Sequence, residues 1–461
     1  MAFKYDLAIL GAGPGGYVGA IRAAQLGLSV CVIEKDKAGG VCLNMGCIPS
    51  KAYIHQAEIF SSIGKLQQLG VSVDLGGFDY AKVQAETRKA ADTLSKGVEF
   101  LLKKNKVQLV QGEGVITGAH EITVDGEQKI SADKILIATG SSPKEIPGFE
   151  VDGKSIMNSD DILMRTDLPK SLIILGAGAI GCEFAHIMNS FGVEVQLVEM
   201  LDHILPAEDE ETAKVLARSF KKRKIKMYTG TKASAPRKEG DKVLLDIENK
   251  KGAQTIEAES LLVVVGRGPN TANIGLENVG ISTERGFIPV GDYYRTSVES
   301  IYAVGDVVAS PLLAHVASKE AEIAVEYMAG QAKAARLDPT LIPTGVYTEP
   351  EVAGFGYTED SAKEAGFEAA ASVFPIRGAG KSVAVEKPEG QVKIVYDANT
   401  KEILGGRIVG TQATDLIHEL LLARSSELLP EDIAEMIHAH PTLSEAIMEA
   451  AKGVDGAPIH A

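Results

Sequence analysis

The chain of 461 residues is longer than one hydrophobic core usually supports, so we expect about three domains. It carries 47 basic and 62 acidic residues, and the resulting net charge of −15 disfavours binding to the phosphate backbone of nucleic acids. Hydrophobic residues make up 45% of the chain, but no apolar run approaches the roughly 18 residues that span a bilayer. These numbers favour a globular protein that binds neither nucleic acid nor membrane.

The four cysteines are Cys31, Cys42, Cys47 and Cys182. A strand-like run begins at residue 5 and leaves no room for an export signal before it. Few cysteines in a long chain without such a signal are typical of a reducing compartment, so we expect a cytoplasmic protein whose only disulfide is catalytic. Cys31 and Cys182 lie in apolar segments and are assigned to packing. Because no second Cys or His pair stands at ligand spacing near the other two cysteines, we expect no metal site.

The strand-like run at residues 5–10 ends in a glycine-rich loop at residues 11–16. A helix-like segment follows at residues 17–26, and then a second strand-like run at residues 29–33 that Glu34 closes. This order is typical of a dinucleotide-binding unit. Its glycines permit a tight turn, close approach to a pyrophosphate and packing of helix on strand, and its acid receives ribose hydroxyls.

The same order of strand, glycine loop, helix, strand and acid occurs a second time. Residues 171–175 lead into a second glycine loop, a helix-like segment at residues 182–191, and a strand-like run at residues 194–198 that Glu199 closes. In both copies the acid follows the last glycine by 18 positions. One glycine pattern alone can be a purely structural turn, but two copies in the same context predict two dinucleotide sites.

Glu199 also indicates which nucleotide the second site prefers. A carboxylate at the ribose favours a free 2′-hydroxyl and repels a 2′-phosphate, so we expect NAD rather than NADP. No arginine occurs in residues 200–205, where a side chain that binds the 2′-phosphate of NADP would be expected. An exposed acid at the end of a strand is the alternative interpretation of Glu199.

Cys42 and Cys47 stand five positions apart, shortly after the first glycine loop. On a straight helix their Cα atoms would be about 8–9 Å apart, beyond the roughly 7 Å that a disulfide allows. A bridge therefore requires a distorted turn, for which Gly46 supplies the backbone freedom, while Pro49 suits the first turn of a following helix. Thiols at the N-terminal end of a helix are stabilised as thiolates. Two buried core cysteines are the alternative.

Residues 39–51 resemble the active-site signature of the flavin-dependent disulfide oxidoreductases. Three further stretches agree with this family: residues 135–140 with the strand that closes an insertion in its flavin domain, residues 301–306 with its second flavin motif, and residues 438–445 with its C-terminal catalytic signature. The likeness covers essentially the whole chain. It is strongest to the branch that oxidises dihydrolipoyl groups, because the second glycine loop lacks an aromatic gate and no cysteine follows Cys182.

This resemblance implies an α/β fold with two doubly wound, Rossmann-like dinucleotide-binding domains and a C-terminal mixed α+β dimerisation domain. We expect the first part of the FAD-binding domain at residues 1–145 and the NAD-binding domain at residues 146–270. A return segment at residues 271–340 would complete the FAD-binding domain, and residues 341–461 would form the interface domain. Within the last, residues 391–396 read as a strand and residues 415–422 as a helix with an apolar face.

The resemblance also assigns catalytic roles. Cys42 would exchange with the lipoyl sulfur, and Cys47 would lie against the flavin. His440, oriented by Glu445 five residues later, would accept the substrate proton, and it would come from the partner subunit of a twofold dimer. His438 is interpreted as structural.

Lys51 and Glu183 would form a buried ion pair beside the flavin, with ordinary surface charges as the alternative. The residues expected to contact FAD are Gly11, Gly13, Gly15, Gly16, Glu34, Gly40, Lys51, Gly114, Thr139, Gly140, Asp306 and Ala314. Those expected to contact NAD are Gly176, Gly178, Ala179, Ile180, Gly181, Glu199 and Gly266. Arg267 could equally be a structural clamp.

The expected activity is reoxidation of a dihydrolipoyl group with transfer of a hydride to NAD+. We expect a homodimer whose partners are the lipoyl domains and acyltransferase cores of 2-oxoacid dehydrogenase complexes, or the lipoylated protein of glycine cleavage. The alternatives are an NAD-linked reductase of another small disulfide, a soluble transhydrogenase and a non-catalytic assembly component. The intact cysteine pair argues against the transhydrogenase, whose family lacks it.

Overall fold

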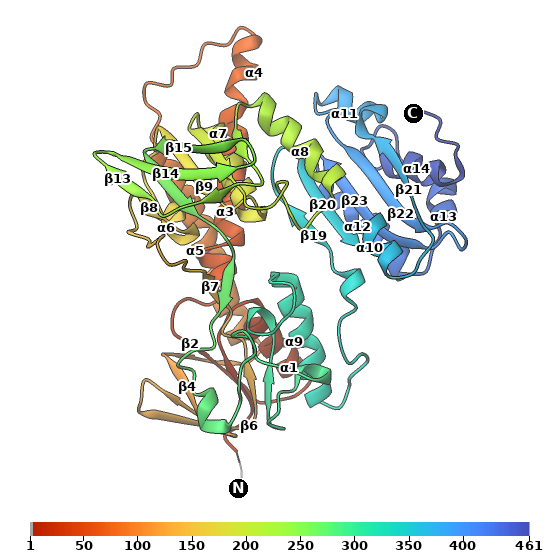
Figure 1. Ribbon diagram of the computed structural model, residues 1–461. Helices are drawn as coiled ribbons and strands as arrows, with labels where there is room; N and C mark the ends of the chain where they lie inside the picture. Colours follow the sequence, from red (N-terminus) through yellow and green to blue (C-terminus); the bar gives the residue numbers. More distant parts are fainter. Residues whose placement is uncertain (1–2, 461) are drawn as a thin grey trace.

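The computed structural model describes residues 3–460 (Figure 1). The first nucleotide module is built on a parallel sheet with β1 at its centre. In spatial order its strands are β3 (Gln108–Gln111), β2 (Val30–Glu34), β1 (Tyr5–Leu10), β6 (Gln128–Ile137) and β18 (Ile301–Ala303). β4 (Gly114–Gly118) and β5 (Glu121–Val124) extend β6 in antiparallel fashion. Leu7, Ala8 and Ile9 of β1 are fully buried, as in a parallel sheet covered on both faces.

Two helices from distant parts of the chain pack together in this module. They are α1 (Pro14–Gln25) and α9 (Ala314–Met328). A Cβ atom added to Gly19 of α1 would lie only 3.1 Å from the Cβ of Ala321 in α9, so glycine permits the close approach. Through β18 and α9 the chain returns to the first module after residue 300.

The second nucleotide module repeats this plan. Its parallel strands, in spatial order, are β11 (Lys226–Tyr228), β10 (Glu194–Val198), β9 (Ser171–Leu175), β16 (Ser260–Val263) and β8 (Ile156–Met157). Its helices are α6 (Ser159–Met164), α7 (Ala179–Ser190) and α8 (Glu210–Lys222). An antiparallel sheet joins it, with strands β12 (Lys232–Ala233), β13 (Arg237–Glu239), β14 (Lys242–Asn249) and β15 (Gly252–Ala258).

The structure confirms the duplicated strand–loop–helix–strand device. The strands expected at residues 5–10, 171–175 and 194–198 have those bounds. Both helices begin earlier than expected, α1 at Pro14 rather than residue 17 and α7 at Ala179 rather than residue 182. The reason is that the last residues of each glycine loop already have helical geometry, and proline is well suited to the first helical position.

A two-stranded ribbon carries the chain out of the first module and back. It pairs β7 (Ser141–Pro143) with β17 (Arg267–Pro269). The division of the chain at residues 145, 270 and 340 stays a prediction.

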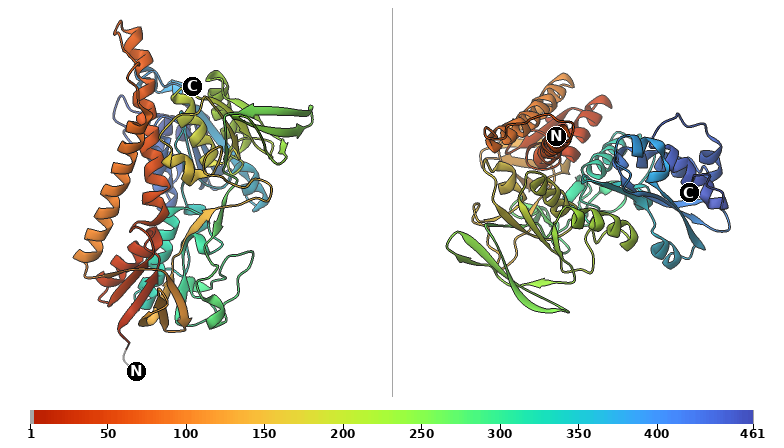
Figure 2. Two further views of the ribbon diagram at one scale, coloured as in Figure 1. Left: turned by 90° about the vertical axis from the view of Figure 1, so that its left-hand side faces the viewer. Right: turned by 90° about the horizontal axis from the view of Figure 1, so that it is seen from above.

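Cys42 and Cys47 lie at the base of a helical hairpin. Its helices are α2 (Gly40–Asn44), α3 (Cys47–Ser61), α4 (Ile63–Gln68) and α5 (Tyr80–Lys104). The long helices α3 and α5 run beside each other along one side of the molecule (Figure 2, left). Tyr53 of α3 and Tyr80 of α5 are both buried, with ring centroids 5.9 Å apart, and α3 also packs on α7 of the second module.

The C-terminal part forms an antiparallel sheet covered by helices. In spatial order its strands are β19 (Thr344–Val346), β20 (Glu351–Gly356), β23 (Ile403–Gly410), β22 (Gln391–Asp397) and β21 (Ala369–Pro375). Its helices are α10 (Glu359–Glu364), α11 (Gly380–Ala384), α12 (Ala413–Ser425), α13 (Pro430–Glu435) and α14 (Glu445–Lys452). The expected strand at residues 391–396 and helix at residues 415–422 are confirmed, each extended by neighbouring residues. Within residues 3–460, every helix is too short or too polar to cross a lipid bilayer.

Candidate active site

The first glycine loop leaves room for a phosphate and little room for side chains. Gly11 has a φ of +101°, and a Cβ there would lie 2.4 Å from the carbonyl oxygen of Ala138. A Cβ at Gly16 would lie 1.9 Å from the carbonyl oxygen of Gly11. By contrast, a Cβ at Gly13 would meet no described atom within 4 Å, so the backbone borders open space where α1 begins. This geometry suits a pyrophosphate at the helix N-terminus.

The second glycine loop has the same shape. Gly176 has a φ of +105°, and a Cβ there would lie 2.5 Å from the carbonyl oxygen of Val264. A Cβ at Gly181 would lie 1.9 Å from the carbonyl oxygen of Gly176, whereas one at Gly178 would meet no atom of residues 3–460 within 4 Å. Ala179 is exposed at the start of α7, and Ile180 is the next residue of that helix. Both loops therefore fit a dinucleotide.

The two strand-end acids are fixed in equivalent ways. Glu34 accepts hydrogen bonds from the backbone N–H groups of Ala12 (2.7 Å) and Asp36 (2.9 Å). Glu199 accepts two hydrogen bonds of the same lengths from the corresponding N–H groups of the second module. Each carboxylate is therefore held beside its glycine loop, with further lone pairs that suit ribose hydroxyls.

Asp306 lies in a single 3₁₀ turn at the end of β18 and belongs to a polar network. Its carboxylate accepts a hydrogen bond from the hydroxyl of Ser141, which in turn accepts one from Nε of Arg267 at 2.8 Å. The preceding N–H, of Gly305, donates to the buried carboxylate of Glu320 at 2.6 Å. Burial raises the pKa of Glu320 to about 7. These contacts support a clamp role for Arg267, and the network could not be recognised from the sequence.

Three other expected FAD contacts lie around the first loop. A Cβ at Gly40 would lie 2.7 Å from the Cα of Gly13, so the helix that carries Cys42 starts against this loop. Ala314 is the first residue of α9. Gly114 is buried at the start of β4, where a Cβ would lie 2.6 Å from the side chain of Leu10, so packing already accounts for a glycine.

The remaining expected cofactor residues lie near the two-stranded ribbon. The hydroxyl of Thr139 donates to the carbonyl of Asn270 at 2.7 Å, and the N–H of Asn270 donates to the carbonyl of Gly140 at 2.9 Å. Gly266 has a φ of +118°, and a Cβ there would meet no described atom within 4 Å. Its backbone is therefore open to a ligand.

Cys42 and Cys47 are free thiols separated by a break in the helix. Gly46 has φ −149° and ψ −113°, so α2 ends before it and α3 starts at Cys47. The hydrogen bond from the Cys42 thiol lowers the pKa of Cys47 to about 7, opposed by partial desolvation of this exposed residue and assisted by the Lys51 ammonium. The same hydrogen bond and burial raise the pKa of Cys42. Cys47 is therefore the preferred thiolate.

The other two cysteines pack in the interior, as expected. Cys31 and Cys182 are fully buried. Burial raises the pKa of Cys31 to about 12, so this thiol stays protonated and inert.

Lys51 and Glu183 form a salt bridge next to the thiols. Nζ of Lys51 lies 3.0 and 2.9 Å from the two carboxylate oxygens of Glu183. The Glu183 side chain is 8% exposed and that of Lys51 is 32% exposed, so the alternative of two surface charges is wrong. Burial acts to lower the pKa of Lys51, but the Glu183 carboxylate outweighs it and the pKa is raised. Tyr347, which sequence reasoning missed, contacts both members of the pair.

His440 and Glu445 are hydrogen-bonded. Nδ1 of His440 lies 2.9 Å from Oε1 of Glu445, whose Oε2 accepts from the N–H of Thr442 at 2.8 Å. Burial acts to raise the pKa of Glu445, but these two hydrogen bonds outweigh it and lower the pKa. The His440 side chain is 75% exposed and accessible to a partner. His438 is instead only 3% exposed at its side chain and is bonded to Glu419 at 2.9 Å, which fits a structural role.

Within a single chain, residues 3–460, the fold does not bring His440 close to the thiols of Cys42 and Cys47. Glu445 begins α14, whereas Cys47 begins α3, and these helices lie on opposite sides of the molecule (Figures 1 and 2). Among the described residues, 3–460, no three His, Cys, Asp or Glu side chains are placed to hold a metal ion.

Comparison with known proteins agrees with this site. Residues 5–321 match the model of the pyridine nucleotide-disulphide oxidoreductases, and residues 342–451 match the dimerisation domain of that family. The chain belongs to the pyridine nucleotide-disulphide oxidoreductase family. Membership confirms the expected fold class and the expected cofactors, FAD and NAD(H), and the dimerisation domain supports a homodimer.

Several members of this family resemble the chain over its full length. The dihydrolipoyl dehydrogenase of Bacillus subtilis is 43% identical, with 100% of both chains covered, and that of Corynebacterium glutamicum is 41% identical, with 99% of both covered. Among solved structures, LpdA of Mycobacterium tuberculosis gives a TM-score of 0.89 at 30% identity, covering 97% of this chain and 98% of that chain. The HOCl-induced flavoprotein disulfide reductase RclA of Escherichia coli shares the fold, with a TM-score of 0.87 at 24% identity over 98% and 99% of the two chains.

Proposed function

We propose that this protein is a dihydrolipoyl dehydrogenase, which oxidises dihydrolipoyl groups and reduces NAD+. The observation that carries the proposal is the pair of free thiols, in which Cys47 is the preferred thiolate, beside the first glycine loop and the Lys51–Glu183 salt bridge. Full-length identity of 43% to the Bacillus subtilis dihydrolipoyl dehydrogenase supports the same assignment.

In the oxidised enzyme Cys42 and Cys47 form a disulfide. A thiolate of the dihydrolipoyl group attacks the sulfur of Cys42, the Cys42–Cys47 bond breaks, and Cys47 leaves as a thiolate. A pKa of about 7 makes Cys47 a good leaving group. The second lipoyl thiolate then attacks the lipoyl sulfur on Cys42, which closes the lipoyl disulfide and releases Cys42. The substrate loses two electrons and two protons, and the cysteine pair gains the electrons.

His440 is the proposed base that accepts protons from the substrate. Its Nδ1 is held by Glu445, which leaves Nε2 free to take a proton. Because His440 is exposed and distant from the thiols of its own chain, it would act on the thiols of the partner subunit in a homodimer. Lys51 and Glu183 would fix the charge around Cys47.

The proposed cofactor contacts belong to the two modules. The first loop, Glu34 and Asp306 would hold FAD, and the second loop and Glu199 would hold NAD. When bound, FAD supplies the carrier through which the electron pair reaches NAD+ as a hydride. The carboxylate of Glu199 would exclude a 2′-phosphate and so select NAD. The proposed partners are lipoyl domains and acyltransferase cores of 2-oxoacid dehydrogenase complexes, or the lipoylated glycine-cleavage protein, in the cytoplasm.

Steady-state kinetics with dihydrolipoamide tests the proposal. We expect NADH to form from NAD+ and dihydrolipoamide, with the activity lost in Cys47→Ser and retained in Cys31→Ala, which removes a buried packing thiol in β2. If NADH instead reduces another small disulfide, such as cystine or glutathione disulfide, more efficiently than lipoamide, the rival reductase activity is correct and the proposal fails.

A further inference from the structure

Tyr347 brings the C-terminal sheet into contact with the salt bridge beside the thiols. It directly follows β19, and its backbone N–H donates to Oε1 of Glu183 at 3.1 Å. Its ring centroid lies 4.4 Å from Nζ of Lys51, well within the roughly 6 Å limit of a cation–π interaction. One residue thus contacts both the anion and the cation of the pair.

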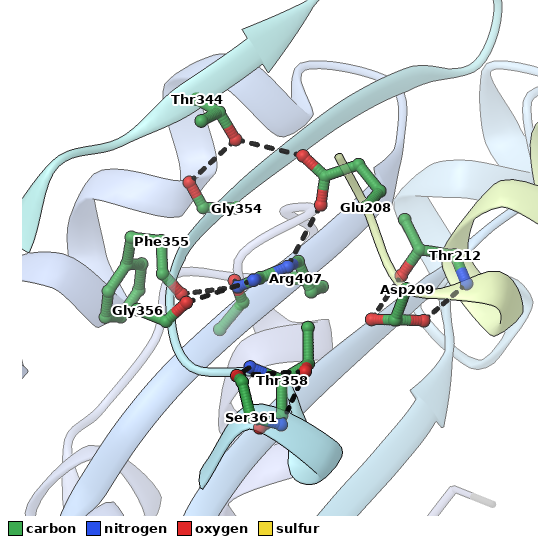
Figure 3. Close-up of polar contacts among 11 residues, drawn as sticks. Glu208, Asp209, Thr212, Thr344, Gly354, Phe355, Gly356, Thr358, Ser361 and Arg407 are labelled. Atoms are coloured by element: carbon green, nitrogen blue, oxygen red, sulfur yellow. Dashed lines mark hydrogen bonds and ion pairs between the residues drawn. The ribbon is translucent and has the colours of Figure 1, made fainter. Parts of the chain in front are cut away.

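The strand that leads to Tyr347 is anchored at its other end. Oγ1 of Thr344, the first residue of β19, lies 3.1 Å from both Oε1 of Glu208 and the carbonyl oxygen of Gly354 (Figure 3). Oε2 of Glu208 lies 3.0 Å from Nε of Arg407, and both of these side chains are buried. β19 is therefore fixed to the second nucleotide module and to the neighbouring strand β20.

The ring of Tyr347 is held as well. Its ring is half-buried, and burial raises the pKa of its hydroxyl, so the ring stays neutral at neutral pH. A half-buried ring that is attached to an anchored strand cannot easily swing away from Lys51.

The position of the Lys51 ammonium matters because Lys51 has a long, flexible side chain that is 32% exposed. It follows Cys47 by four residues in α3, so the two side chains lie on the same face of the helix. The Cys42 thiol and the Lys51 ammonium lower the pKa of Cys47, whereas the Glu183 carboxylate raises it. If the ammonium moved away, the negative charge of Glu183 would be less well neutralised and the pKa of Cys47 would rise.

We propose that Tyr347 is a positioning residue, whose ring holds the Lys51 ammonium in place near Cys47. This inference rests on the proposed function only in taking Cys47 as a redox thiol. It adds an aromatic contact from the C-terminal sheet to a pair formed by the two nucleotide modules, so that all three parts of the chain set the charge around one sulfur.

The test is a pH titration of the two-electron-reduced holoenzyme, followed by the long-wavelength absorbance of the Cys47 thiolate against flavin. Tyr347→Leu removes the aromatic face, Tyr347→Phe keeps it, and Tyr357→Leu is a matched control, because Tyr357 packs on Phe367 in the same domain. We expect the midpoint to rise by about 0.5–1 pH unit in Tyr347→Leu. Tyr347→Phe and Tyr357→Leu should keep the wild-type midpoint.

The inference is overturned if Tyr347→Leu has the wild-type midpoint, or if Tyr347→Phe shifts as far as Tyr347→Leu. Should the leucine variant fail to fold, Tyr347→Met, which fills more of the ring volume without a π face, takes its place with the same expected shift. Because reduction is carried out chemically, without a lipoyl substrate, this result is independent of whether dihydrolipoamide is the physiological reductant. Failure of the proposed function would appear only in the kinetics with dihydrolipoamide.

Discussion

The ammonium of Lys51 lies 2.9 Å from the carboxylate of Glu183, and this salt bridge joins the two nucleotide modules beside the redox thiols. Lys51 belongs to α3 and Glu183 to α7, helices that also pack on each other through apolar side chains. The charge near Cys47 therefore depends on how the two modules sit together. Substitutions in the pair are expected to change stability and thiol acidity together.

Lys51→Met leaves the carboxylate of Glu183 buried without its cation. Fully buried pairs broken in this way lose roughly 3–5 kcal/mol, and because Lys51 is 32% exposed we expect a smaller loss of about 2 kcal/mol. The free energy of unfolding in urea measures it. Lys65→Met is the matched control, since Lys65 pairs with Glu386 on the surface and should contribute less than about 1 kcal/mol. Equal losses in the two variants would contradict a buried role for Lys51.

Glu199→Ser removes the carboxylate that would repel a 2′-phosphate. We expect the ratio of kcat/KM for NAD+ to that for NADP+ to fall by about tenfold or more, because like-charge repulsion is relieved. Steady-state kinetics with both nucleotides measures this ratio. Glu34→Gln, at the equivalent position of the first module, should lower flavin content and leave the ratio unchanged. An unchanged ratio in Glu199→Ser would show that this acid does not select the nucleotide.

Mixed dimers test which subunit supplies the base, His440, to a given pair of thiols. Cys47→Ser and His440→Gln homodimers should each be inactive, but a hybrid dimer of the two has one site with intact thiols from one subunit and an intact His440 from the other. Activity should therefore appear when the two variants are unfolded and refolded together. If His440 acted on the thiols of its own chain, every hybrid site would carry one defect and the mixture would stay inactive.

Glu320 makes stability depend on pH in a defined direction. Burial raises the pKa of this carboxyl from 4.5 to about 7, so over this interval the unfolded chain has released a proton that the folded chain retains. Folding stability should therefore fall as the pH rises from about 4.5 to 7, by up to about 3 kcal/mol from this group.

Glu320→Gln should flatten this pH dependence, as measured by urea unfolding at several pH values. Glu322→Gln is the control, because Glu322 lies two residues after Glu320 but forms a surface pair with Lys319, and it should leave the slope unchanged. A wild-type slope in Glu320→Gln would contradict the assignment.

Much of the fold could be predicted because its determinants are local. The strands around both glycine loops are short apolar runs ended by glycines whose backbone conformations other residues rarely adopt, such as Gly11 and Gly176. The duplication of the pattern then indicated two modules of the same plan. Helix starts were less accurate, because Pro14 and Ala179 belong both to the loop and to the first helical turn.

The residues that sequence reasoning missed depend on contacts between distant segments. Tyr347 meets Lys51 and Glu183 only because β19 is anchored on the second module, and the local sequence around Tyr347 carries no sign of this. Ser141 likewise reaches Asp306 across 165 positions of chain. Lys51 and Glu183 were expected as a buried ion pair from family resemblance alone, because the sequence shows only that each lies next to a glycine or cysteine motif.

Differential thiol labelling under anaerobic conditions tests the central claim most directly. In the oxidised enzyme the disulfide should protect Cys42 and Cys47 from alkylation. One equivalent of dihydrolipoamide should make both cysteines alkylatable, as measured by peptide mass spectrometry. Labelling of Cys31 and Cys182 should not change. Subsequent NAD+ should reverse the labelling and yield NADH. If dihydrolipoamide leaves Cys42 and Cys47 in their original state, electrons do not pass through this sulfur pair and the account is wrong.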